Sequence, residues 1–95
     1  GRLLTMYAAW KLDQGDRARK EVSMAKVQVA DCLNKTIDTC IQLCGARGYS
    51  RDTLLEWMYR YARQAQLVDG ASEVHKMIMS RFFINEGRDF WSWDA

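Results

Sequence analysis

The sequence contains no proline and only one histidine, His75, among its 95 residues. It also lacks any apolar run long enough to cross a bilayer, and its N-terminus lacks the basic-then-apolar pattern of a signal peptide. No pair of strand-like segments joined by a tight turn is visible. Apolar residues instead recur at spacings of three and four, which predicts helices. With one histidine, a zinc site would need Asp or Glu ligands, and no metal site is predicted.

Strong net charge is missing as well. The formal net charge is +2, and the basic residues are dispersed along the chain. The single cluster, residues 17–20, is flanked by Asp16 and Glu21, which is typical of a solvated helix face. The composition therefore gives no reason to expect a nucleic-acid partner.

The three cysteines, Cys32, Cys40 and Cys44, are an odd number and fall within one helical stretch. Only Cys40 and Cys44 are near enough to consider pairing, and successive helical turns hold their Cβ atoms too far apart for a disulfide. Buried free thiols in a reducing compartment are the prediction. The cytoplasm or the mitochondrial matrix would fit this expectation.

The periodicity predicts four helices, over residues 3–12, 17–44, 51–65 and 70–87. Gly15 is a good stop for the first helix, and Asp16 is a good N-cap for the second. Ser50 is a plausible N-cap for the third. The second segment is apolar on nearly two faces, so it should pack on more than one side. The expected fold is an all-α, up-and-down bundle of about four helices in a single domain, residues 1–95.

Both ends of the chain suggest a piece of a larger protein. The sequence begins already in a helical pattern, and its tail "RDFWSWDA" places Phe90, Trp91 and Trp93 within four residues. Three large rings in a terminal octapeptide have no local face to bury against. Either they fold back on the bundle, or they pack on another domain or a second subunit.

The segment "IQLCGARGYS", residues 41–50, carries two glycines three residues apart after a helix. Glycines let backbone N–H groups approach an anion, and the next helix would add positive potential, with Arg47 as a counter-charge. A phosphate site and a plain helix connector both fit this pattern.

The segment "LVDGASEVH", residues 67–75, carries Asp69 and Gly70 before an apolar helix. Asp69 fits a helix N-cap or a turn residue. A carboxylate at a helix start also fits a general base. His75 is interpreted as a hydrogen-bonded helix residue rather than a ligand.

Together, the two segments resemble the C-terminal helical domain of the acyl-CoA dehydrogenases. The family pattern Gln-x-x-Gly-Gly-x-Gly-Tyr/Phe matches residues 42–49. About twenty residues later, an acidic residue followed by Gly, Thr, Ser and an acidic or amide residue matches residues 69–73, and Arg63 fits the basic position before them. The resemblance extends from Arg2 to about Phe83.

The resemblance implies a three-domain FAD enzyme that introduces an α,β double bond into an acyl-CoA, and it assigns roles to individual residues. Asp69 would be the general base, where Glu is usual, and Gly70 would lie at the substrate. The residues that the resemblance implies to bind FAD are Gln42, Gly45, Ala46, Gly48, Ala71 and Glu73, with Ser72 beside them.

Two of these positions depart from the family pattern, because Ala46 replaces a glycine and Ala71 replaces a threonine. The glycine segment would contact the FAD of a neighbouring subunit, which implies a homodimer or homotetramer. Since the chain contains neither the β-domain nor the N-terminal helical domain of the family, these residues should be inactive alone. The alternative is a non-catalytic helical interaction or oligomerisation module. A family member that has lost its activity is a third interpretation.

Overall fold

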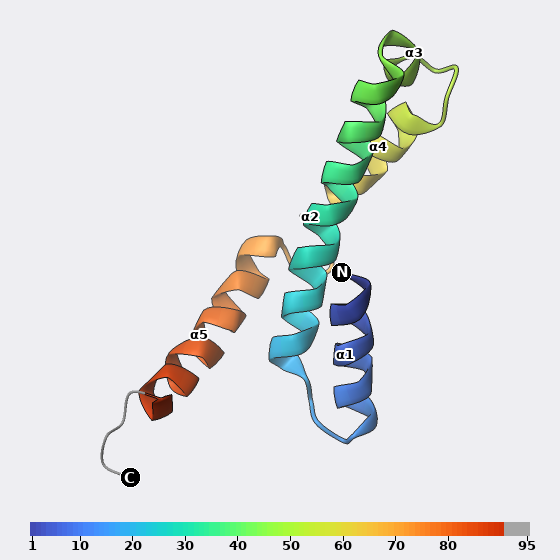
Figure 1. The fold of residues 1–95 in the computed structure, drawn as a ribbon. Coiled ribbons are helices and arrows are strands. Elements are labelled where there is room, and N and C mark those ends of the chain that lie inside the picture. The colour runs from blue at the N-terminus through green and yellow to red at the C-terminus, as the bar shows by residue number, and fades with distance from the viewer. Residues whose placement is uncertain (91–95) are drawn as a thin grey trace.

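A computed structural model describes residues 1–90 as five helices, and no strand occurs within that range. The helices are α1 (Arg2–Asp13), α2 (Arg19–Cys44), α3 (Ala46–Tyr49), α4 (Leu55–Gln64) and α5 (Ser72–Phe90) (Figure 1). The all-α prediction is confirmed. The fifth helix, the single turn of α3, was not predicted, because four residues are too few to show a periodicity.

The long helix α2 is the spine of the molecule, and each of the other helices packs against it. α1 runs antiparallel to α2 beside its first half, and α4 runs back along its second half (Figure 1). α5 starts beside the first half of α2, where His75 bonds Ser23, and runs toward the start of α2, where Glu86 pairs with Lys20 (Figure 1). The prediction that the long helix, now α2, packs on more than one side is confirmed. The result is an elongated shape of 62 × 27 × 20 Å.

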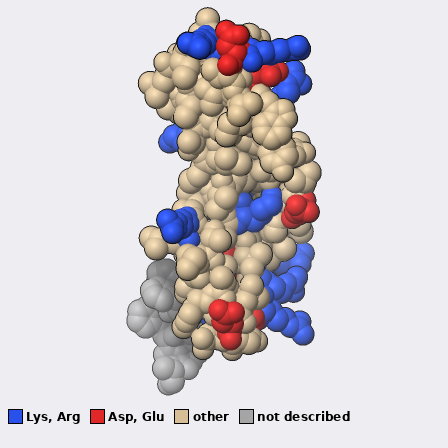
Figure 2. Space-filling view, turned by 90° about the vertical axis from the view of Figure 1, so that its right-hand side faces the viewer, with Lys and Arg blue, Asp and Glu red and all other residues tan. Residues whose placement is uncertain are grey.

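Small residues form the contacts between the helices. The buried apolar positions are Ala8, Ala18, Ala25, Ala30, Ile37 and Ala62. Alanines let helix backbones approach closely, but they bury little apolar area. Large side chains stay exposed, including Leu3 at 85% and Leu43 at 82%. Figure 2 shows a face on which uncharged side chains cover most of the area, while acidic and basic side chains adjoin at one end.

The connection from α1 to α2 differs from the prediction in one detail. Gly15 ends the first helical segment with a φ of 83°, as expected for a left-handed C-terminal position. Asp16, however, is not the N-cap of α2. Its Oδ1 accepts a hydrogen bond of 2.7 Å from the amide of Ala18, which adopts a left-handed φ of 51° before α2 begins at Arg19. This amide and Lys11 lower the pKa of the Asp16 carboxyl, the amide being the larger cause.

Ser50 is likewise not the N-cap of the following helix, because α4 begins only at Leu55. The Ser50 hydroxyl donates to the carbonyl of Arg47 at 2.7 Å and accepts from the amide of Asp52 at 3.2 Å. Near the start of α4 it is Thr53 whose side chain accepts a backbone hydrogen bond, from the Leu55 amide to Oγ1 at 3.3 Å. The prediction that Ser50 is an N-cap was wrong. A serine hydroxyl can bond nearby backbone groups either in a turn or at a helix start, and the sequence alone does not distinguish the two.

The cysteines are free, as expected, but the prediction that they are buried was wrong. Cys32 and Cys44 are exposed and Cys40 is half-buried, because the short flanking helices leave much of α2 uncovered. No group of three metal-ligating side chains occurs in the described part of the chain. Within residues 1–90, none of the helices is long and apolar enough to cross a membrane. The rings of Phe90, Trp91 and Trp93 fall outside the described side chains.

Candidate functional site

The glycine segment forms the tip of the molecule, where α2 ends and α3 turns back. Gly45 has φ 64° and ψ −144°, a conformation available almost only to glycine. A Cβ on Gly45 would meet no atom within 4 Å, whereas a Cβ on Gly48 would lie 2.8 Å from Cβ of Cys44. Gln42, Gly45 and Ala46 are exposed and Gly48 is buried. The packing of α3 on α2 therefore requires the second glycine, and the backbone turn requires the first.

The aspartate segment forms the turn between α4 and α5. Asp69 and Gly70 are successive left-handed residues, with φ of 55° and 85°. Asp69 is thus a turn residue rather than an N-cap, since α5 begins at Ser72. The left-handed conformation costs a non-glycine residue about 1–2 kcal/mol, and aspartate is among the residues that tolerate it. The consequence is an exposed carboxylate on a defined turn.

The neighbours of Asp69 differ in accessibility. Ala71 is half-buried, and Glu73 is exposed on the first turn of α5. Ser72, which the family resemblance placed beside the FAD-binding residues, is buried, and its Oγ has no hydrogen-bond partner within the described residues. Of these three side chains, only Glu73 presents an accessible polar group.

Polar side chains of α2 hold the connection between α4 and α5. The Lys26 ammonium donates to the carbonyl of Val68 at 3.0 Å and also to that of Ala65. Asn34 donates to the carbonyl of Ala62 at 2.8 Å. The Lys26 ammonium thus satisfies two carbonyls just beyond the end of α4, whereas the carbonyl of Ala62 also accepts from the amide of Ala65 at 3.0 Å. Sequence reasoning missed Lys26, because its partners lie 39 and 42 residues away.

His75, on the first turns of α5, is hydrogen-bonded through both ring nitrogens, to Ser23 of α2 and to the carbonyl of Asp69. The interpretation of His75 as a hydrogen-bonded helix residue is confirmed.

The two segments lie at different levels of the spine. The aspartate turn is held at the level of Lys26, and the glycine turn follows Gln42. With a rise of about 1.5 Å per residue, these two positions are about 24 Å apart along α2. One copy of the chain therefore does not bring the two predicted parts of the site together.

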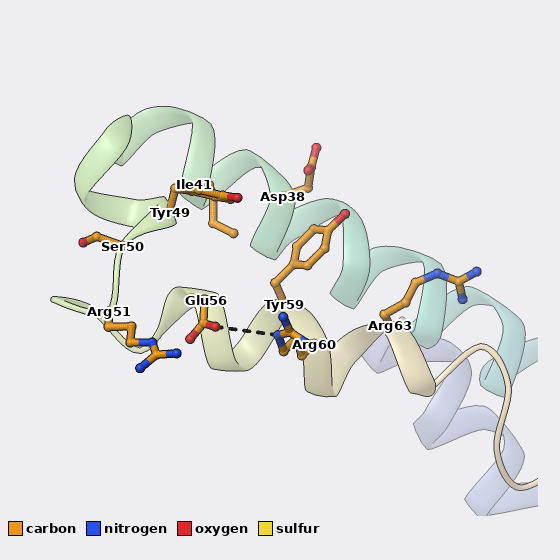
Figure 3. Close-up of a pocket in the computed structure, with 9 residues that line it drawn as sticks. All are labelled: Asp38, Ile41, Tyr49, Ser50, Arg51, Glu56, Tyr59, Arg60 and Arg63. Atoms are coloured by element: carbon orange, nitrogen blue, oxygen red, sulfur yellow. Dashed lines mark ion pairs between the residues drawn. The ribbon is translucent and has the colours of Figure 1, made fainter.

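A groove of about 870 Å³ lies between α2 and α4 near the glycine turn (Figure 3). Nε of Arg60 lies 3.6 Å from Oε1 of Glu56 on α4. The residues that line the groove are Asp38, Ile41, Tyr49, Ser50, Arg51, Glu56, Tyr59, Arg60 and Arg63. No residue of the aspartate turn is among them, so this groove and the Asp69 carboxylate do not form one cleft.

Comparison with known proteins connects this geometry to a family. The family model "Acyl-CoA dehydrogenase, C-terminal domain" matches residues 1–84. The chain is 46% identical over 83 residues to acyl-CoA dehydrogenase family member 11 of Gallus gallus, covering 85% of the chain and 11% of that protein. It is 36% identical over 90 residues to (R)-benzylsuccinyl-CoA dehydrogenase of Thauera aromatica, covering 94% of the chain and 22% of that protein.

A third relative carries a reductase name. The chain is 37% identical over 79 residues to 3-(aryl)acrylate reductase of Clostridium sporogenes, covering 83% of the chain and 21% of that protein. The chain thus spans between about a tenth and a fifth of the length of these relatives. Because the family model covers nearly the whole helical chain, the chain belongs to the acyl-CoA dehydrogenase family, as its C-terminal helical domain.

Proposed function

We propose that these residues are part of a longer, three-domain FAD-dependent acyl-CoA dehydrogenase, to which they contribute the general base and part of the FAD site. The observation that carries the proposal is that Asp69, which the resemblance assigns as the base, presents an exposed carboxylate on a left-handed turn. The match over residues 1–84 supports the register of that position.

In this proposal the Asp69 carboxylate removes the proton from the α-carbon of the acyl thioester. A bound FAD supplies the acceptor for the hydride that leaves the β-carbon. Aspartate is one methylene shorter than the usual glutamate, so the α-carbon must approach the turn by about 1 Å more. Gly70 helps this approach, because it places no side chain next to the carboxylate.

The glycine turn is proposed to serve the cofactor of a second copy. Gln42 offers an exposed amide, and the space around Gly45 is open to an approaching phosphate or ribose. The contribution of Ala46 and Gly48 is to shape the turn, since Gly48 is buried. From the aspartate turn, the backbone at Ala71 and the carboxylate of Glu73 face the cofactor of the same copy.

The separation of about 24 Å between the two turns supports an assembly in which each FAD lies between two copies. A homodimer or homotetramer satisfies this requirement. The large exposed side chains, such as Trp57 at 59% and Leu3 at 85%, supply apolar area for packing against other domains and other copies.

The test is Asp69→Asn in the full-length protein, compared with Asp69→Glu. Asn retains the size and the turn preference but cannot take a proton, so kcat should fall about 10²- to 10⁴-fold with normal flavin content. Glu should keep measurable activity. Retained turnover of an acyl-CoA by Asp69→Asn, in either the oxidative or the reductive direction, contradicts the assignment.

The alternative, a non-catalytic helical module, predicts a different result. The purified full-length protein would then lack the absorption of oxidised flavin. A protein that binds FAD but turns over no acyl-CoA would indicate a family member that has lost its activity.

A further inference from the structure

The turn at Asp69 holds two successive residues in the left-handed region. Backbone of this kind persists where the surrounding structure fixes it, and such positions cluster at functional sites. The groups that fix this turn are therefore candidates for a part in the function.

His75 bridges the turn to the spine. Its Nε2 lies 3.3 Å from the carbonyl oxygen of Asp69, and its Nδ1 lies 2.9 Å from Oγ of Ser23. Ser23 is 2% exposed and sits in the first turns of α2. The imidazole thus connects a buried point of the longest helix to the peptide unit of the residue proposed as the base.

Hydrogen-bond chemistry selects one tautomer of the neutral ring. A carbonyl oxygen only accepts, so Nε2 must carry the hydrogen that points at Asp69. In the neutral imidazole Nδ1 is then the acceptor, and the Ser23 hydroxyl donates to it. Both bonds form together in this one tautomer.

Gly70 completes the fit between ring and turn. A Cβ on Gly70 would lie 2.7 Å from Nε2 and 3.3 Å from Cε1 of His75. The ring therefore packs directly on the backbone of the turn. The ring in its present position therefore leaves no room for a side chain at residue 70.

We infer that His75 is a positioning residue, which holds the Asp69 peptide unit and so aims its carboxylate. This inference rests on the proposed role of Asp69 as the base. His75 does not touch the substrate; it acts on the backbone from which the carboxylate projects. Lys26 holds the neighbouring carbonyl of Val68 independently at 3.0 Å, so the loss of His75 changes the turn locally and leaves the connection in place.

Two substitutions separate the two bonds of the ring. The amide nitrogen of glutamine can reach the position of Nε2, and the amide of asparagine can reach only the position of Nδ1. His75→Gln should keep kcat within about 3-fold. His75→Asn should lower kcat by about 10- to 100-fold, because a misplacement near 1 Å has that effect on a reacting group. KM and flavin content should stay unchanged in both, and Lys76→Gln, the next residue on the helix, is the control.

A second readout distinguishes failure of this inference from failure of the proposed base. Hydrogen exchange at the Ser72 amide, which closes the turn by bonding the carbonyl of Gln66 at 3.0 Å, should speed up in the full-length His75→Asn variant and not in His75→Gln, whatever the activity of Asp69→Asn. Equal kcat and equal exchange in the Gln and Asn variants would overturn the inference. If His75→Asn does not fold, Ser23→Ala replaces it, because it frees the ring from its buried anchor. An unchanged kcat in Ser23→Ala would also overturn the inference.

Discussion

Replacing Gly70 by alanine perturbs the site at its tightest point. The residue has a φ of 85°, and the added methyl would lie 2.7 Å from Nε2 of His75. The ring cannot remain where it is, because a Cβ atom does not come this close to a non-bonded heavy atom. The substitution therefore strains the backbone and also displaces the imidazole.

The expected loss of stability follows from these two effects. Alanine in the left-handed region costs about 1–2 kcal/mol. Displacing the ring removes its hydrogen bonds to Ser23 and Asp69, each worth about 0.5–1.5 kcal/mol. The sum is about 2–5 kcal/mol for Gly70→Ala.

The assay is the free energy of local opening at the start of α5, from native-state hydrogen exchange. The amides of Val74 and His75 report it, since both bond the carbonyl of Ala71, at 3.0 and 3.1 Å. Gly70→Ala, His75→Ala and the double variant form a cycle. The ring's two hydrogen bonds can be lost only once, so the double variant should lose about 1–3 kcal/mol less than the sum of the single variants. Additivity within about 0.5 kcal/mol would refute a contact between ring and turn.

Four further substitutions test other parts of the structure. Lys26→Met should destabilise by about 1–3 kcal/mol, because it removes charged donors from the carbonyls at the end of α4, and exchange should rise at residues 65–68 but not in α1. Asp16→Asn should lower the melting temperature at pH 7. Because the pKa of Asp16 is lowered in the folded state, the difference in melting temperature between the two proteins should disappear as the pH falls below 3.8, the ordinary pKa of an aspartate, and through the folded-state pKa. Gly48→Ala should destabilise by about 1–3 kcal/mol through overpacking, measured by thermal unfolding. Gly87→Ala, whose Cβ meets nothing within 4 Å, should instead stabilise by about 0.5–1 kcal/mol.

Most helix positions could be predicted from the sequence, because periodicity is a local signal. The long helix was expected over 17–44 and is found over Arg19–Cys44. The start of α4 was placed four residues too early, since Ser50 forms a turn with Asp52 rather than a cap. The small size of the core could not be predicted. An apolar stripe identifies a face, but it does not say whether a neighbour within the same chain covers it.

In the candidate site, too, residues in local motifs could be predicted and residues in long-range contacts could not. Asp69 and Gly45 could be identified because they belong to spaced motifs. Lys26 and Ser23 could not, because their partners lie 42 and 52 residues away and no local pattern marks such pairs. Their effect is on the geometry of the turn, which only a folded chain defines.

The spine also sets the length tolerance of this protein. The part of α2 between Lys26 and Gln42 fixes both the distance and the angle between the aspartate turn and the glycine turn. One inserted residue would move the glycine turn by about 1.5 Å and rotate it by about 100° around the helix axis. Seven inserted residues, close to two full turns, would nearly restore the angle but add about 10 Å. Insertions should therefore be excluded from this stretch of α2, while the turn at residues 50–54, which carries neither motif's spacing, can vary in length.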